Sequence, residues 1–195
     1  YGYPRLEEIK SSITNKKKIN IKKTILIAPS WGLNSITNLC IFEILENLLN
    51  SNFNIIYRPH NMSLKKDKKI IKNIISKYSK FNNFEFDNSN YSFKNLLTAD
   101  LLIADWGSTA ADFALGLTKP VIFIDLPPKI KNRNFKEISS TSFEFEIRNK
   151  IGHIITKDKI NLLQKIIIQI FNDKNSEPKK NNEFINEFIY NFLDS

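Results

Sequence analysis

Two short polar motifs in this chain carry side chains that can hold or neutralise phosphate. The first, Asp105-Trp106-Gly107-Ser108-Thr109, follows a short apolar run and precedes alanines at helical spacing. A helix that begins here presents unpaired backbone amides and the positive end of its dipole, and the two hydroxyls add further donors. The same residues also suit an ordinary helix N-cap, and the two uses can coexist.

The second motif, Arg58-Pro59-His60, ends another apolar run. Arginine offers a planar fork of donors that matches a phosphate, and histidine can hold a phosphate oxygen or move a proton near neutral pH. We therefore predict that Arg58 and His60 take part in catalysis, against the plainer interpretation that a lone histidine is structural.

A third polar motif lies near residue 30, where Gly32 permits a tight turn and Ser30, Asn34 and Ser35 offer hydroxyls and an amide. The alternative is an ordinary strand-to-helix connection with Ser35 as the N-cap. Asp105 either caps a helix or faces a ligand hydroxyl, and Asp112 is more ambiguous. The predicted donor-binding residues are Ser30, Trp31, Gly32, Asn34, Asp105, Trp106, Gly107, Ser108, Thr109 and Asp112.

Apolar runs and amphipathic segments alternate along the chain, which predicts how these motifs are positioned. Strands are expected over residues 24–31, 53–60, 84–87, 100–105, 120–125 and 152–156. Helices are expected over residues 35–50, 63–81 with Ser63 as N-cap, 91–99, 109–117, 158–172 and 181–193, whereas 126–149 reads as polar and turn-rich. The pattern indicates an α/β fold, a Rossmann-like doubly wound parallel sheet with helices on both faces. Ligands of such folds bind outside the carboxyl ends of the strands, where all three motifs fall.

The amino-acid composition limits the classes of partner that the protein is expected to bind. A chain of 195 residues with 42% hydrophobic residues suits one domain with its own core. The net charge of +9 fits an anionic partner, such as nucleotide phosphates, an acidic polymer or an anionic membrane face, or else a solubilising surface. Because no arginine-rich tract occurs, we predict no nucleic-acid partner. One cysteine and two histidines argue against a disulfide and a metal site, so no metal and no cofactor are predicted.

The chain also lacks several sequence signatures. No apolar run reaches the roughly 18–20 residues that cross a bilayer, and the first residues do not resemble a signal peptide. We expect a cytoplasmic protein, at most peripheral at the inner face of the cell membrane. Neither G-x-G-x-x-G nor GxxxxGK[ST] occurs, which excludes a standard NAD domain and a P-loop ATPase.

Four segments, GYPRL, ILIAPSWG, RPH and LLTADLLIADWGSTAADFALGLTKPVIFID, occur in this order between Gly2 and Asp125. Together they resemble the CDP-glycerol glycerophosphotransferase family, the bacterial teichoic acid primases and polymerases. The resemblance implies a GT-B-like architecture, with the active site between two Rossmann-like lobes. This chain resembles the C-terminal, nucleotide-binding lobe, and GYPRL resembles the segment that joins the lobes.

The resemblance also implies roles for individual residues. The helix that begins at Ser108 and Thr109 would receive the pyrophosphate of CDP-glycerol, and Arg58 and His60 would reach the phosphates or assist departure of CMP. A base on the N-terminal lobe would activate the acceptor hydroxyl. Two departures from the family pattern, Asn61 for a common proline and Gly107 for a second serine, leave the donor open to another polyol phosphate or a nucleotide sugar.

We therefore expect a transferase that moves glycerol phosphate from a CDP-activated donor to an anionic polymer or a lipid-linked acceptor. Residues 1–23 are expected to form an interlobe linker with a first helical segment, 24–172 the nucleotide-binding domain, and 173–195 a C-terminal helix that crosses to an N-terminal lobe. Alternatives are the lobe of a GT-B glycosyltransferase or UDP-sugar epimerase, and a non-catalytic nucleotide-binding scaffold.

Overall fold

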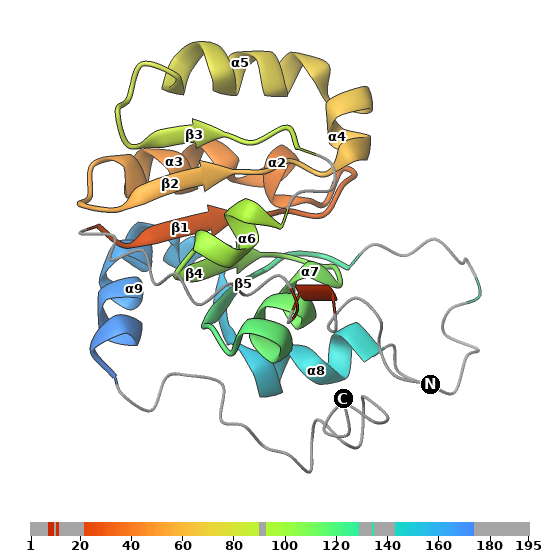
Figure 1. Cartoon of the computed structure of the whole chain (residues 1–195). Helices are drawn as coiled ribbons and strands as arrows, with labels where there is room; N and C mark the ends of the chain where they lie inside the picture. The colour runs from red at the N-terminus through yellow and green to blue at the C-terminus, as the bar shows by residue number, and fades with distance from the viewer. Residues whose placement is uncertain are drawn as a thin grey trace.

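A single parallel sheet organises the protein (Figure 1). The computed structural model describes residues 8–9, 11, 22–89, 93–128, 134 and 143–173. Within these residues the strands are β1 (Thr24–Ile27), β2 (Asn54–Tyr57), β3 (Phe84–Phe86), β4 (Leu101–Ala104), β5 (Val121–Asp125) and β6 (His153–Thr156). Their order across the sheet is β3-β2-β1-β4-β5-β6, and every neighbouring pair is parallel. The predicted Rossmann-like, doubly wound fold is confirmed.

The central strands are apolar along their whole length because both faces of the sheet are covered. Every residue of β1 and β4 is buried, whereas the edge strands β3 and β6 expose part of theirs. Ile25 and Ile27 face a core that they share with α3 (Ile41–Leu49), α5 (Lys68–Tyr78) and α9 (Leu163–Asn172). Leu26 faces the opposite core, beneath α6 (Lys94–Thr98), α7 (Thr109–Ala111) and α8 (Phe143–Ile151).

Several expected helices are interrupted. The segment 35–50 divides at Cys40, whose φ of −157° leaves the helical region, into α2 (Ile36–Leu39) and α3. The segment 109–117 begins as α7 and continues as a π-helix, η1 (Asp112–Gly116), and the segment 158–172 begins with a 3-10 helix, η3 (Lys157–Leu162).

The N-cap predicted at Ser63 is wrong. The helix begins earlier, as α4 (Asn61–Lys66), and His60 occupies the cap. Ser63 lies inside α4 and is fully buried. A break at Asp67 then separates α4 from α5. His60, predicted to end a strand, is instead the N-cap of α4.

The structure contains a helix that the sequence analysis missed. Residues 126–149 read as polar and turn-rich, yet α8 covers Phe143–Ile151. Ile147 and Ile151 are one turn apart and buried, as is Arg148. The helix predicted over 181–193 lies outside the described residues, as do most of the two terminal segments, so the domain boundaries at 23 and 173 stay predictions.

Candidate functional site

The order of the strands changes direction between β1 and β4: the chain adds β2 and β3 on one side of β1, and β4, β5 and β6 on the other. β1 and β4 are neighbours, yet the chain leaves β1 toward α2 and α3 on one face and β4 toward α7 on the other. Such a topological switch point opens a crevice at the carboxyl ends of the two strands, the usual ligand site of this fold. Two of the three polar motifs, around residues 30 and 105, therefore face each other across this point.

Asp105 ties the two loops together. Its Oδ1 accepts hydrogen bonds from the backbone amides of Ser30 and Trp106, each at 2.6 Å, and its Oδ2 accepts one from Ile36 at 2.7 Å. The side chain is completely buried, and this burial raises its pKa, while the three amide hydrogen bonds act in the opposite direction. Asp105 thus caps α2, a helix 69 residues earlier in the chain, rather than the helix that follows it.

The loop after β1 reaches the start of α4. Gly32 adopts a φ of +104°, which favours glycine, and its carbonyl accepts hydrogen bonds from the Ser35 amide and the Asn38 side chain. Asn34 is exposed, and Ser30 and Trp31 are half-buried. The Trp31 and His60 rings lie 6.2 Å apart between centroids, so the motif near residue 30 meets the Arg58-Pro59-His60 motif.

The loop after β4 divides into buried and exposed residues. Trp106 is buried, and its indole N–H donates to the Leu126 carbonyl at 2.9 Å. Gly107 and Ser108 are exposed, and the Ser108 side chain makes no capping hydrogen bond although it occupies the N-cap of α7. Thr109 is half-buried and Asp112 fully buried, so the accessible donors of this loop are at 107–109.

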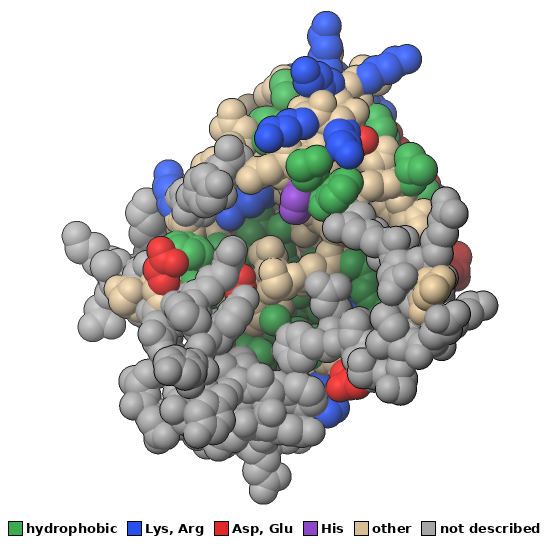
Figure 2. Space-filling model, turned by 90° about the vertical axis from the view of Figure 1, so that its right-hand side faces the viewer, with side chains coloured by type: hydrophobic (Ala, Val, Ile, Leu, Met, Phe, Trp, Pro, Cys, Tyr) green, Lys and Arg blue, Asp and Glu red, His purple; other side chains and the backbone are tan. Residues whose placement is uncertain are grey.

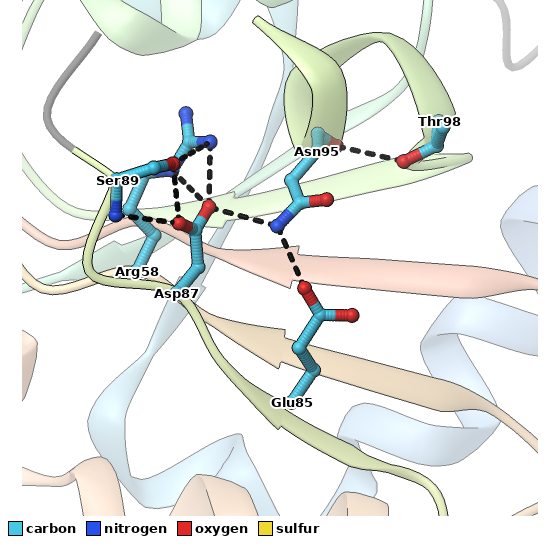
Figure 3. A network of polar contacts seen from close by, with 6 residues as sticks. All are labelled: Arg58, Glu85, Asp87, Ser89, Asn95 and Thr98. Atoms are coloured by element: carbon cyan, nitrogen blue, oxygen red, sulfur yellow. Dashed lines mark hydrogen bonds and ion pairs between the residues drawn. The ribbon is translucent and has the colours of Figure 1, made fainter. Parts of the chain in front are cut away.

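Arg58 is held by an acidic partner that the sequence analysis did not identify (Figure 3). Its Nε and Nη2 lie 2.6 Å and 2.5 Å from Oδ2 of Asp87, which directly follows β3. Asp87 also accepts hydrogen bonds from the Ser89 amide at 2.8 Å and the Asn95 side chain at 2.9 Å. Burial acts to raise the pKa of Asp87, but the Ser89 and Asn95 hydrogen bonds and the Arg58 charge outweigh it and lower the pKa. The guanidinium therefore has a fixed orientation at the edge.

His60 has a defined protonation pattern. Its Nδ1 accepts a hydrogen bond from the Met62 amide at 3.0 Å, so this nitrogen carries no proton. In the neutral ring the proton must then sit on Nε2, which acts as a donor. The side chain is exposed. A histidine in this state can donate a hydrogen bond to a phosphate oxygen.

Arg148 is a second residue that the sequence analysis missed, because it lies in the unrecognised helix α8. Its guanidinium lies 3.9 Å from the centroid of the Trp106 ring and forms an ion pair with Asp125 at 3.4 Å. The guanidinium thus stacks on the buried Trp106 ring while it is anchored to the end of β5 through Asp125. Arg148 thereby supports the loop that presents Ser108.

Figure 2 looks onto this edge from the right-hand side of Figure 1, toward which the strand arrows point. The surface is hollowed near its middle, with a histidine and hydrophobic side chains at the border. Lysine and arginine side chains crowd the upper part, at the height of α4 and α5.

Other chemistry has little support among the residues that the structure describes. They contain no group of three or more His, Cys, Asp or Glu side chains placed to hold a metal ion. Burial raises the pKa of the Cys40 thiol to about 12, which disfavours the nucleophilic thiolate. No helix in the described part of the chain is both long and apolar enough to span a membrane.

Comparison with known proteins agrees with this fold and identifies the family. Residues 1–191 match the family described as CDP-Glycerol:Poly(glycerophosphate) glycerophosphotransferase, and the chain belongs to it. The resemblance noted in the sequence is thereby confirmed. No curated protein matches the chain.

Three solved structures are similar to this chain, and the first two show the same fold. MnaA of S. aureus with UDP is 16% identical with a TM-score of 0.56, and the match covers 86% of this chain and 43% of that one. A UDP-GlcNAc 2-epimerase of Neisseria meningitidis bound to UDP-GlcNAc is 13% identical with a TM-score of 0.50, covering 86% and 40%. The wall teichoic acid polymerase TagF is 20% identical with a TM-score of 0.45, covering 94% and 46%. The chain thus spans less than half the length of each.

Proposed function

We propose that this chain is the donor-binding lobe of a transferase that moves glycerol phosphate from CDP-glycerol to a hydroxyl of an anionic polymer or lipid-linked acceptor. The observation that carries the proposal is the crevice between β1 and β4, where Asp105 joins two loops and Ser108 keeps an exposed hydroxyl. Membership of the glycerophosphotransferase family supports the choice of donor. With a lipid-linked acceptor, the enzyme would act at the cytoplasmic face of a bacterial membrane.

The proposed reaction is a displacement at phosphorus. The acceptor hydroxyl attacks the β-phosphate, which carries glycerol, a new P–O bond forms, and the bond to the α-phosphate oxygen breaks to release CMP. The hydroxyl proton passes to a base on the other lobe. Amides and hydroxyls of residues 107–109 would hold the non-bridging oxygens, and the oriented Arg58 would neutralise charge. The His60 Nε2 proton would stabilise the departing phosphate.

A nucleotide-sugar donor is the second candidate. MnaA, whose structure contains UDP, shares the fold of this chain, although at 16% identity the likeness extends to the fold alone. A non-catalytic nucleotide-binding lobe is the third. The three candidates differ in the ligand that binds and in whether turnover occurs.

Calorimetric titration separates the donors. The chain is titrated with CDP-glycerol, CDP, UDP and UDP-GlcNAc, and we expect the cytidine compounds to bind at least about tenfold more tightly, or about 1.4 kcal/mol. Ser108→Ala and Thr109→Ala should each weaken CDP binding by about 0.5–1.5 kcal/mol, the value of one hydrogen bond. Ser79→Ala, an exposed serine at the end of α5, is the matched control.

Preferential binding of UDP-GlcNAc would replace the first candidate with the second. Release of CMP from CDP-glycerol, measured with a protein that contains both lobes and an acceptor, tests catalysis. Tight CDP-glycerol binding without CMP release would favour the scaffold.

A further inference from the structure

A groove runs along the outer surface of α4 and α5, separate from the crevice at β1 and β4. Its volume is about 400 Å³, and it is lined by Leu64, Lys68, Ile71, Lys72, Ile75 and Ser76. These residues recur at spacings of three and four, so they share one side of the helices and neighbouring side chains lie close together. Leu64 and Ile75 are half-buried and Ile71 is buried, whereas the two lysines are exposed. The groove therefore has an aliphatic floor and a cationic rim.

The charge around the groove is unbalanced. Five exposed lysines, Lys65, Lys66, Lys68, Lys69 and Lys72, lie on α4 and the first half of α5, and the only acid in this stretch is Asp67. Among the described residues, no ion pair involves Lys68 or Lys72. The contrast is Lys77, at the end of α5, which pairs with Glu46 at 2.5 Å. The uncompensated charge is thus concentrated at the groove and favours an anionic partner.

The shape of the surface distinguishes between anionic partners. A helix that adsorbs to a bilayer inserts large exposed apolar side chains between the lipids. Of the large hydrophobic residues exposed in the described part of the chain, none lies on α4 or α5. The apolar atoms are recessed between ammonium groups instead, which suits a narrow flexible chain rather than a flat membrane. Lysine is a compact point charge that binds phosphate without the planar geometry of arginine.

The groove also adjoins the donor edge. His60 caps the start of α4, and the Lys66 Nζ lies 5.0 Å from the centroid of Trp31 in the loop after β1. The lysine side chains therefore continue from the site that is proposed to bind the donor toward the outer surface of α5. A chain seated in the groove would approach the site along this path.

We propose that the groove binds a linear phosphodiester polymer, the acceptor class of the proposed function, on which this inference rests. Phosphates would lie against Lys68 and Lys72, and the methylene groups of the polymer backbone would contact Leu64 and Ile75. The groove then holds the growing polymer beside the donor site and raises its local concentration.

The test is fluorescence anisotropy with labelled poly(glycerol phosphate) at 50 mM salt and above. The variant Lys68→Gln/Lys72→Gln removes two contacts, and the control Lys159→Gln/Lys165→Gln removes two exposed lysines of η3 and α9. At about 0.7 per lost contact, the salt slope should become shallower by about 1.4, with affinity reduced at least about fivefold. The control should change affinity less than about twofold, and equal losses in both variants would overturn the proposal.

Ser76→Trp tests the groove without changing charge. Because the indole fills the groove, affinity should fall at least about threefold, and an unchanged affinity would show that the lysines attract the polymer without seating it. Equal or tighter binding of single-stranded DNA of matched charge, or of phosphatidylglycerol vesicles, would also contradict the proposal. CDP titration of each variant keeps the two hypotheses apart. Intact CDP binding without polymer binding overturns this inference alone, whereas absent CDP binding overturns the proposed function.

Discussion

Two aspartates at the same edge of the sheet have different structural roles. Asp105 follows β4 and Asp87 follows β3, and both are almost completely buried. Asp105 accepts hydrogen bonds from three backbone amides, whereas Asp87 binds the guanidinium of Arg58. Burial raises the pKa of Asp105, while hydrogen bonds and the Arg58 charge overcome burial and lower the pKa of Asp87. One carboxylate therefore joins the two loops of the crevice, and the other fixes the orientation of a cation at the same edge of the sheet.

The largest effect is expected from Asp105→Ala. Three buried or half-buried amides lose their acceptor, and at about 1–3 kcal/mol each the free energy of unfolding should fall by about 3–9 kcal/mol. Urea denaturation measures this loss. Asp105→Asn keeps one acceptor oxygen and should lose less. A loss below about 1 kcal/mol for the alanine variant would contradict the structural role of Asp105.

Asp87→Ala should have the next largest effect. It removes the carboxylate that pairs with the Arg58 guanidinium, whose side chain is only 18% exposed. We expect the free energy of unfolding to fall by about 2–4 kcal/mol, somewhat less than for a fully buried pair. Glu46→Ala is the matched control, because it breaks an exposed pair with Lys77, and exposed pairs contribute little to stability.

Asp87→Asn separates the role of Asp87 in orienting the Arg58 guanidinium from its contribution to stability. It preserves the shape of the side chain but removes the charge that orients Arg58. CDP affinity should fall in this variant and in Arg58→Ala, and the two losses should not add in the double variant. Additive losses would show that Asp87 acts independently of Arg58.

His60 gives a smaller effect with two separable parts. His60→Ala removes the N-cap of α4 and should lower the free energy of unfolding by about 0.5–2 kcal/mol. His60→Asn restores a capping acceptor but not the Nε2 proton. If His60 assists CMP departure, both variants lose turnover in a protein with both lobes, and only the alanine variant loses stability. Normal turnover in the asparagine variant would restrict His60 to the capping role.

The smallest effect is a difference in pH dependence. The lowered pKa of Asp87 contributes stability that is present above the ordinary aspartate pKa of about 3.9 and is lost as pH falls through the folded value. The raised pKa of Asp105 has the opposite sign, because the folded state then binds the proton more readily, so its cost appears as pH rises above about 3.9. Denaturation of the wild type and of each asparagine variant between pH 3 and 7 measures both. If the free energies of unfolding of the wild type and both asparagine variants changed in parallel with pH, the opposite pKa shifts of Asp87 and Asp105 would be contradicted.

The strands were predictable from sequence because buried parallel strands are continuous apolar runs, as in Leu101–Ala104. The polar residues that follow these apolar runs lie at the carboxyl edge of the sheet, as predicted. The partners of those residues were not predictable, since Asp105 binds amides 75 and 69 residues away. An acid at the carboxyl end of a predicted strand was nevertheless a usable signal for Asp87, because Asp105 has the same placement in its predicted strand.

Local sequence patterns gave wrong helix boundaries where contacts with distant parts of the chain determine the structure. Ser63 has the right residue type for an N-cap, but the chain turns one residue after Pro59, and His60 takes the cap. α8 was missed because charged residues surround Ile147 and Ile151. Arg148 in this helix is buried through its stacking on Trp106, which no single segment of sequence reveals.

Amide-detected NMR of the chain during titration with CDP-glycerol tests the central claim most directly. The account predicts that the largest chemical-shift changes occur in the two loops joined by Asp105, at residues 30–36 and 106–109, with smaller changes at 58–60. Saturation without shifts in these loops, or with the largest shifts along α5 or α9, would contradict the assignment of the donor site to the β1–β4 crevice.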